Sequence, residues 1–130
     1  MINIEIDVFD AVYRAVELLL PEGCFSSDYT PMPPALPHAS LVEMDNYTDR
    51  DKLDTSLHEK YAIVAYEANV YGEDRFQVRR IMDAIDEKMQ ELGFTRLSLR
   101  PVDNVANPSI YRLTARYRAE VNSNKQIFRR

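Results

Sequence analysis

A long run of strict alternation near the end of the chain most constrains what the chain can fold into. Residues 109–121 read SIYRLTARYRAEV. One alternate set is mostly apolar or aromatic: Tyr111, Leu113, Ala115, Tyr117, Ala119 and Val121. The other set is mostly polar and carries three arginines: Ile110, Arg112, Thr114, Arg116, Arg118 and Glu120. Period-two alternation is typical of a strand with one buried face, so the chain needs a sheet with a basic second face.

Other segments supply partners for this strand. Residues 59–72, EKYAIVAYEANVYG, are apolar on both faces for most of their length, which predicts a central strand covered on both sides. Residues 39–47 predict a shorter strand, and TRLSLRP at 95–101 alternates Thr95, Leu97 and Leu99 with Arg96, Ser98 and Arg100. The turn NSNK leads into a last extended segment, QIFRR.

Two segments carry apolar residues at helical spacing. The first is 7–20, with Asn3 or Asp7 at its start and Pro21 near its end. The second is 73–94, which starts with two acids and ends at Gly93, a typical left-handed cap. The order helix, strands, helix, strands predicts an α+β fold, a mostly antiparallel sheet with both helices packed on one face.

The composition suits one soluble domain over residues 1–130. Apolar residues make up 45% and charged residues 28%, an ordinary balance for a protein in water. Cys24 is the single cysteine, so no intramolecular disulfide is expected, and the acidic start MINIEIDVFD predicts synthesis in the cytoplasm. Two stretches depart from the compact pattern: a proline-rich arm at 30–38 and a polar loop at 48–59.

Charge is divided unevenly along the chain. The net charge is −5, yet residues 96–130 contain eight basic and two acidic residues and carry about +6, which leaves about −11 on residues 1–95. Such a division predicts complementary contact, either with nucleic acid or with the acidic half of another copy. Because the whole protein is acidic and repels phosphate at long range, the second option is favoured.

The sequence offers no catalytic, metal-binding or cofactor-binding residue, and no cofactor is expected. His38 and His58 lack partners at metal-ligand spacing and are expected to be solvated loop residues, and nothing nearby activates Cys24. The three glycines form no phosphate-binding loop. The acids of the second helix are expected on its solvent side: Asp83, Asp86 and Glu87.

Two groups of residues remain as candidates for contact with partners. The arm group either packs on its own sheet or lies on a neighbouring subunit: Phe25, Tyr29, Met32, Pro33 and Pro34. The basic group would share one sheet face if strands 95–101 and 109–121 pair: Arg96, Arg100, Arg112, Arg116 and Arg118. Such a face is either simply solvated, or meets acids on a partner, or contacts phosphates without sequence preference. Aromatic residues for base stacking are not expected on it.

The chain as a whole resembles a family of small phage proteins. The phrases that carry the resemblance are INIEIDVFDAVYRAVELLLPEG, PHASLVEMDN, YEANVYGED, RIMDAIDEKMQELGFTR and IYRLTARYRAEV. They resemble tail-completion proteins, the tail terminators of prophages and long-tailed bacteriophages. The resemblance spans nearly the whole chain, although it contains no catalytic or other invariant motif.

The resemblance implies a structural role in the virion rather than an enzymatic one. Such proteins form a homo-oligomeric ring, commonly a hexamer, that caps the tail tube in the tail–neck region and meets the head connector, and the genome passes through the ring. The implied partners are other copies, the tail tube protein, the head connector or adaptor protein and, transiently, genomic DNA, with no membrane. Whether the arginines line the lumen or the subunit interface is left open.

Three alternative functions stay open from the sequence. A head-completion or connector protein of the neck has a similar size and texture. A small cytosolic α+β ligand-binding domain would need convergent polar groups in a pocket, which the sequence does not reveal. A nucleic-acid-binding module would use the arginine face and would show a steep dependence on salt.

Overall fold

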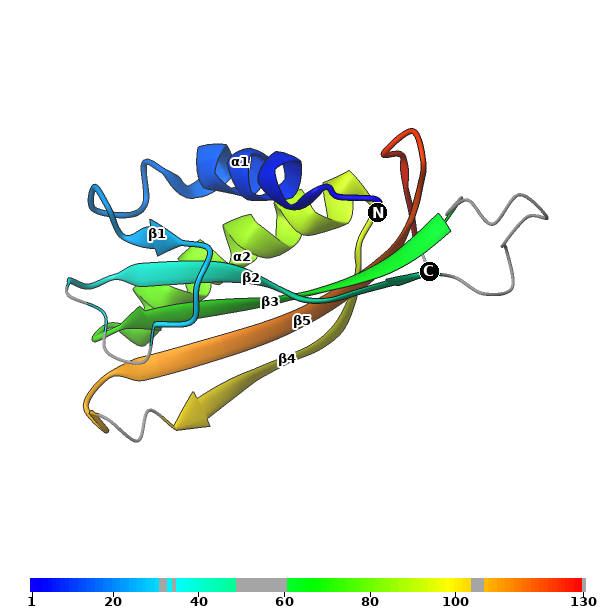
Figure 1. The fold of residues 1–130 in the computed structure, drawn as a ribbon. Coiled ribbons are helices and arrows are strands. Elements are labelled where there is room, and N and C mark those ends of the chain that lie inside the picture. Colours follow the sequence, from blue (N-terminus) through cyan, green and yellow to red (C-terminus); the bar gives the residue numbers. More distant parts are fainter. Residues whose placement is uncertain (31–32, 34, 49–60, 104–106, 130) are drawn as a thin grey trace.

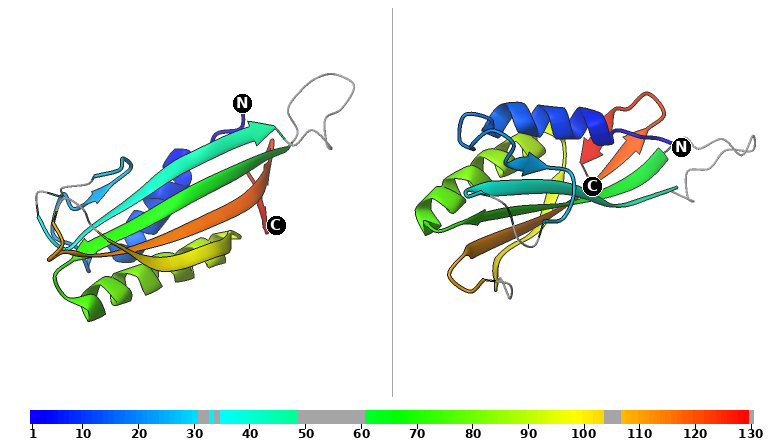
Figure 2. Two further views of the ribbon diagram at one scale, coloured as in Figure 1. Left: turned by 90° about the horizontal axis from the view of Figure 1, so that it is seen from below. Right: turned by 60° about the vertical axis from the view of Figure 1, so that its left-hand side comes forward.

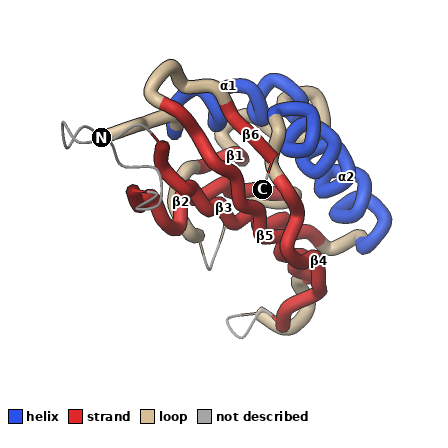
Figure 3. The backbone as a smooth tube through the Cα atoms, turned by 90° about the vertical axis from the view of Figure 1, so that its right-hand side faces the viewer, coloured by secondary structure: helices blue, strands red, loops and turns tan. Residues whose placement is uncertain are grey.

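In the part of the chain that the structure describes, two helices lie on one face of a six-stranded sheet (Figures 1 and 3). The computed structural model describes residues 1–30, 33, 35–48, 61–103 and 107–129. The elements in chain order are α1 (Glu5–Val16), β1 (Phe25–Ser26), β2 (His38–Thr48), β3 (Tyr61–Gly72), α2 (Arg75–Leu92), β4 (Thr95–Asp103), β5 (Tyr111–Asn122) and β6 (Ile127–Arg129). The strand order is β1-β2-β3-β5-β4, and β6 pairs with the far end of β5. All pairs are antiparallel except β1 with β2, so the predicted α+β fold is confirmed.

The core lies between the helices and the central strand pair. β3 and β5 pair along twelve residues each, from Tyr61 opposite Asn122 to Gly72 opposite Tyr111. Their helix-side residues are buried, as the alternation predicted: Val64, Tyr66, Ala68, Val70, Leu113, Ala115, Tyr117 and Ala119. The helices add their own buried stripes: Val8, Val12, Val16, Val78, Ile81, Met82, Ile85 and Met89. Each large aliphatic side chain buried in this way contributes roughly 1.5–3 kcal/mol.

The helix ends follow the predicted signals to different degrees. At the start of α2, Asp74 accepts a hydrogen bond from the Phe76 backbone N–H at 2.9 Å, and Gly93 ends the helix with φ of 109°. A Cβ atom at Gly93 would lie 3.1 Å from Ile127 Cγ2, so glycine also suits the close approach of β6. In α1, Asn3 accepts from the Glu5 N–H at 3.1 Å, and the helix begins and ends earlier than the predicted range of 7–20.

The segment after α1 returns to its own sheet. Residues Phe25–Ser26 form a short parallel strand beside β2, which the sequence did not predict. The Phe25 ring lies 4.7 Å from the ring of Phe9 and 5.8 Å from that of Tyr13. The arm residues Met32 and Pro34, and the loop residue His58, lie outside the described residues, as does nearly all of the predicted loop 48–59.

Two irregularities interrupt the outer strand pairs. The register between β2 and β3 shifts between Glu43 and Asp45, and that between β4 and β5 shifts between Arg96 and Ser98. A bulge adds one residue to one strand and reverses the sides of the residues that follow. As a result Met44 and Leu97 are 55% and 56% exposed. The prediction that Leu97 shares a face with Thr95 and Leu99 in unbroken alternation is therefore wrong.

A pair of carboxylates meets under the start of α1. Glu43 of β2 is half-buried on the helix side of the sheet and accepts a hydrogen bond from the Tyr66 hydroxyl at 3.4 Å. Burial raises the pKa of Glu43, and the neighbouring Glu5 carboxyl raises it further. The folded state therefore binds a proton at this carboxyl more tightly than the unfolded chain does.

Replacement of Glu43 by glutamine tests this carboxylate pair. Because the pKa of Glu43 is higher in the folded state than in the unfolded chain, the ionised carboxyl lowers the stability of the fold. This loss is absent below the pKa of the unfolded chain, and it grows as pH rises from there through the pKa of the folded state. We expect Glu43→Gln to be more stable than the wild type at pH 7, and the difference to shrink as pH falls through the acid range. Thermal unfolding across pH measures this, with Glu22→Gln in an exposed loop as the control. A pH-independent difference would contradict the assignment.

Candidate functional site on the open face of the sheet

The face of the sheet opposite the helices carries the polar side chains of the central strands. The left view of Figure 2 shows the sheet from the side of this open face, with α1 behind the strands. β3 contributes Glu67 and Asn69, which pair across to Arg116 and Thr114 of β5. The predicted basic residue Arg116 therefore lies on this open face, where it stands opposite the acidic residue Glu67.

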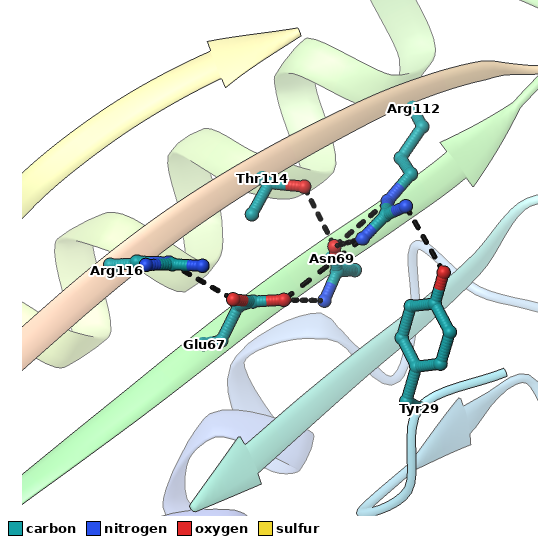
Figure 4. Close-up of polar contacts among 6 residues, drawn as sticks. All are labelled: Tyr29, Glu67, Asn69, Arg112, Thr114 and Arg116. Atoms are coloured by element: carbon teal, nitrogen blue, oxygen red, sulfur yellow. Dashed lines mark hydrogen bonds and ion pairs between the residues drawn. The ribbon is translucent and has the colours of Figure 1, made fainter. Parts of the chain in front are cut away.

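Glu67 is the centre of this polar cluster (Figure 4). Its Oε2 atom accepts from Arg116 Nε at 3.0 Å, and its Oε1 atom lies 4.0 Å from Arg112 Nη2. The side chain of Glu67 is 11% exposed and that of Arg112 13%, whereas that of Arg116 is 54% exposed. The Glu67–Arg112 contact is therefore largely shielded from water, and Arg116 reaches outward from it.

Asn69 connects the acid to the neighbouring strand. Its side-chain oxygen accepts from Arg112 Nε at 3.0 Å and Nη2 at 2.8 Å, and from the Thr114 hydroxyl at 2.7 Å. Its amide nitrogen donates to Glu67 Oε1 at 3.0 Å. Asn69 is fully buried, and its oxygen and nitrogen both have partners, as a buried amide requires. The cluster therefore fixes side chains of β3 and β5 to one another on a face without helices.

Arg112 is also covered by the arm. Its Nη1 atom donates to the Tyr29 hydroxyl at 3.2 Å, and its guanidinium carbon lies 5.1 Å from the ring centre of Tyr29 and 5.5 Å from that of Tyr71. Burial raises the pKa of Tyr71 to about 12, although the guanidinium acts in the opposite direction. Aromatic rings therefore do stand on this face, contrary to the prediction. For Tyr29, packing on its own sheet is the arrangement observed.

His38 differs from the sequence prediction as well. It begins β2 and is buried, with its Nε2 atom 3.4 Å from the Ser26 hydroxyl. Burial lowers the pKa of His38, which favours the neutral ring at pH 7. The expectation of a solvated loop histidine is wrong for this residue because the strand extends to include it.

Arg96 lies on the opposite face from the other four arginines. The bulge at Leu97 turns it toward α2, where its Nη1 atom lies 3.0 Å from Asp86 Oδ2. Asp86 also accepts from the Tyr117 hydroxyl at 2.7 Å and from Gln90 at 2.9 Å. Burial raises the pKa of Tyr117, and the hydrogen bond from its hydroxyl to Asp86 raises that pKa further. Asp86 is therefore a half-buried contact between helix and sheet, not a solvent-side acid as predicted.

The remaining basic residues differ in how they are used. Within the described residues, Arg100 and Arg118 have no acid within ion-pair distance, and Arg100 is exposed. Arg112 is held inside the polar cluster. Part of the charge division seen in the sequence is thus neutralised within the chain, and Arg100, Arg116 and Arg118 are the arginines that the open face offers to a partner.

A shallow groove runs beside Arg116 and Arg118 on the open face. It has a volume of about 300 Å³ and reaches from one bulge to the other. We call it the bulge groove and define it by Met44, Tyr47, Ala65, Leu97, Arg116 and Arg118. Its exposed apolar residues were missed by sequence reasoning because alternation alone does not reveal a bulge.

The described residues contain no group of three His, Cys, Asp or Glu side chains able to hold a metal ion. Cys24 is buried, with its Sγ atom 4.0 Å from the Ala35 carbonyl oxygen. Neither helix in the described part of the chain has the length and apolar character needed to cross a membrane.

Comparison with known proteins gives a likeness in fold. One chain in a structure described as the virion of a native gene transfer agent particle superposes with a TM-score of 0.62 and 17% sequence identity. The superposition covers 88% of this chain and 94% of that chain. No protein-family model and no curated protein matches the sequence. The two chains therefore share a fold over almost their full lengths.

Removal of Glu67 tests the polar cluster. Glu67→Ala leaves the nearly buried Arg112 without its counter-ion and the buried Asn69 side-chain nitrogen without its acceptor, so we expect a loss of about 2–3 kcal/mol in the free energy of unfolding. Arg116→Ala removes an exposed partner and should cost only about 0–1 kcal/mol. Denaturant unfolding of both variants measures the difference. Equal losses would mean that the cluster is held by its exposed contact.

Proposed function

We propose that this chain is a structural virion protein that caps the tail tube as a homo-oligomeric ring and forms part of the head–tail joining interface. It acts without catalysis, and DNA passes through the ring. The observation that carries the proposal is the likeness in fold to a chain of a gene transfer agent virion over 88% of this chain and 94% of that one. Because nearly all of both chains is shared, the likeness reaches beyond a common substructure.

The open face supports this function physically. A ring that lets DNA pass should attract phosphate weakly and without sequence preference. With a net charge of −5 on the chain, the few outward arginines give only a modest local attraction. The likeness also suits a head-completion or connector protein of the neck, since the matching chain is described only as part of a virion. The proposed partners are the tail tube protein and the head connector, in the virion neck.

Recruitment to isolated virion parts tests the proposal. Tails and DNA-filled heads are prepared separately from the phage or prophage that encodes this chain, with its gene deleted, and each is mixed with the purified protein. We expect the protein to sediment with tails, to appear at the head-proximal end of the tube, and to restore joining to heads. Tails from complete particles, whose ends are already capped, serve as the control and should capture none.

Other outcomes assign or exclude the role. Capture by heads alone would overturn tail capping and favour the head-completion alternative. Capture by neither part would overturn a role in the neck.

A further inference from the structure

The bulge groove combines exposed apolar side chains with cations. Met44 and Leu97 are displaced outward by the two bulges, and Tyr47 is 43% exposed beside them. Arg118 has no acidic partner among the described residues, and Arg116 binds Glu67 through Nε while over half of its side chain stays exposed. Exposed apolar groups next to cations indicate a surface for a partner that is both apolar and acidic.

The outer surface of α1 has the complementary character. Ile6, Asp10, Tyr13 and Glu17 follow one another at helical spacing, so they form a single stripe that alternates apolar and acidic side chains. We call this stripe the α1 ridge. Glu17 follows the last residue of α1 but keeps helical backbone angles, with φ of −56° and ψ of −33°, so the stripe continues through it.

The α1 ridge is exposed and partly held in position. Ile6 is 72% and Tyr13 40% exposed, and the Tyr13 ring lies 5.8 Å from that of Phe25, close to parallel with it. An aromatic side chain already fixed by its neighbour loses little freedom when it binds, which favours a contact made by Tyr13.

We propose that the bulge groove of one copy of this chain receives the α1 ridge of the next copy. The contact places Ile6 and Tyr13 against the apolar groove residues, and Asp10 and Glu17 near Arg116 and Arg118. The proposal rests on the ring in the proposed function and adds the two surfaces that build it.

The positions of the two surfaces determine the type of assembly. The groove residues Ala65, Arg116 and Arg118 belong to the open face of the sheet. The helix α1 lies on the opposite face, as Figures 1 and 2 show. A contact between different surfaces of identical copies is heterologous. An open assembly therefore has a free groove at one end and a free ridge at the other until the rotation closes a ring. A two-fold symmetric dimer uses the same patch on both copies and is not expected here.

A pair of single-surface variants tests this directly. The ridge variant is Ile6→Lys with Asp10→Lys, and the groove variant is Leu97→Glu with Arg118→Glu. We expect each to bind itself at least about tenfold more weakly than the wild type. Mixed together, they should form complexes that contain both variants, beginning with a dimer of one copy of each, because the ridge variant keeps its groove and the groove variant keeps its ridge. Mass by light scattering reports both results.

A matched control separates the contact from a general effect of added charge. Phe76→Lys with Asp83→Lys makes the same chemical changes at exposed positions of α2 and should assemble as the wild type does. Melting temperatures of all variants confirm that each is folded. The proposal is overturned if the folded variants stay monomeric when mixed, if either variant alone assembles as readily as the wild type, or if the wild type is monomeric at its highest soluble concentration.

The two proposals fail in different ways. Capture of a monomeric wild-type chain by tails would overturn the groove–ridge contact and leave tail capping in place. Formation of the mixed dimer without capture by tails would support the contact and overturn tail capping. A wild type that assembles while the variants assemble equally well would overturn the groove–ridge contact.

Discussion

The rest of the structure depends on the twelve-residue pairing of β3 with β5. This pairing gives the sheet two faces of different chemistry, since side chains alternate strictly along both strands. On one face, the apolar side chains of both strands pack against the buried apolar residues of the two helices. On the other, Glu67 and Asn69 of β3 meet Arg112, Thr114 and Arg116 of β5, and the buried members satisfy one another's hydrogen bonds. Packing and polar pairing therefore select the same register, and a slip by one residue would destroy both.

The polar cluster also changes what the basic face can do. A ladder of free arginines would attract phosphate strongly and hinder its passage. Glu67 shields Arg112 and partly neutralises Arg116, and Asp86 holds Arg96 on the other side of the sheet. The cations that remain outward are few, and they stand beside apolar side chains. Cations beside apolar side chains are compatible with contact to another protein surface as well as with weak contact to DNA.

The strands on either side of the central pair contain the irregularities that the β3–β5 pairing lacks. β2 and β4 each contain a bulge, and each bulge turns an apolar side chain out of the regular pattern. Bulges are common at sheet edges and next to binding sites. At its bulge β2 is an edge, because β1 pairs only with Ala39 and Ser40. Met44 and Leu97 thus frame a groove on a face whose centre is closed by polar contacts. In the proposed assembly, the rigid central pair positions the groove and the irregular outer strands give it its chemistry.

The sequence by itself determined the two amphipathic helices, the acidic start of α2 and its cap at Gly93, and the alternation of β5. These are local signals, because a helix stripe or a strand period depends only on nearby residues. Only the tertiary structure decided which arginines share a face, since that depends on a one-residue shift in the pairing of β4 with β5. It also decided that His38 and Asp86 are not solvated and that Tyr29 covers Arg112, because burial and long-range contacts arise only when distant segments pack together.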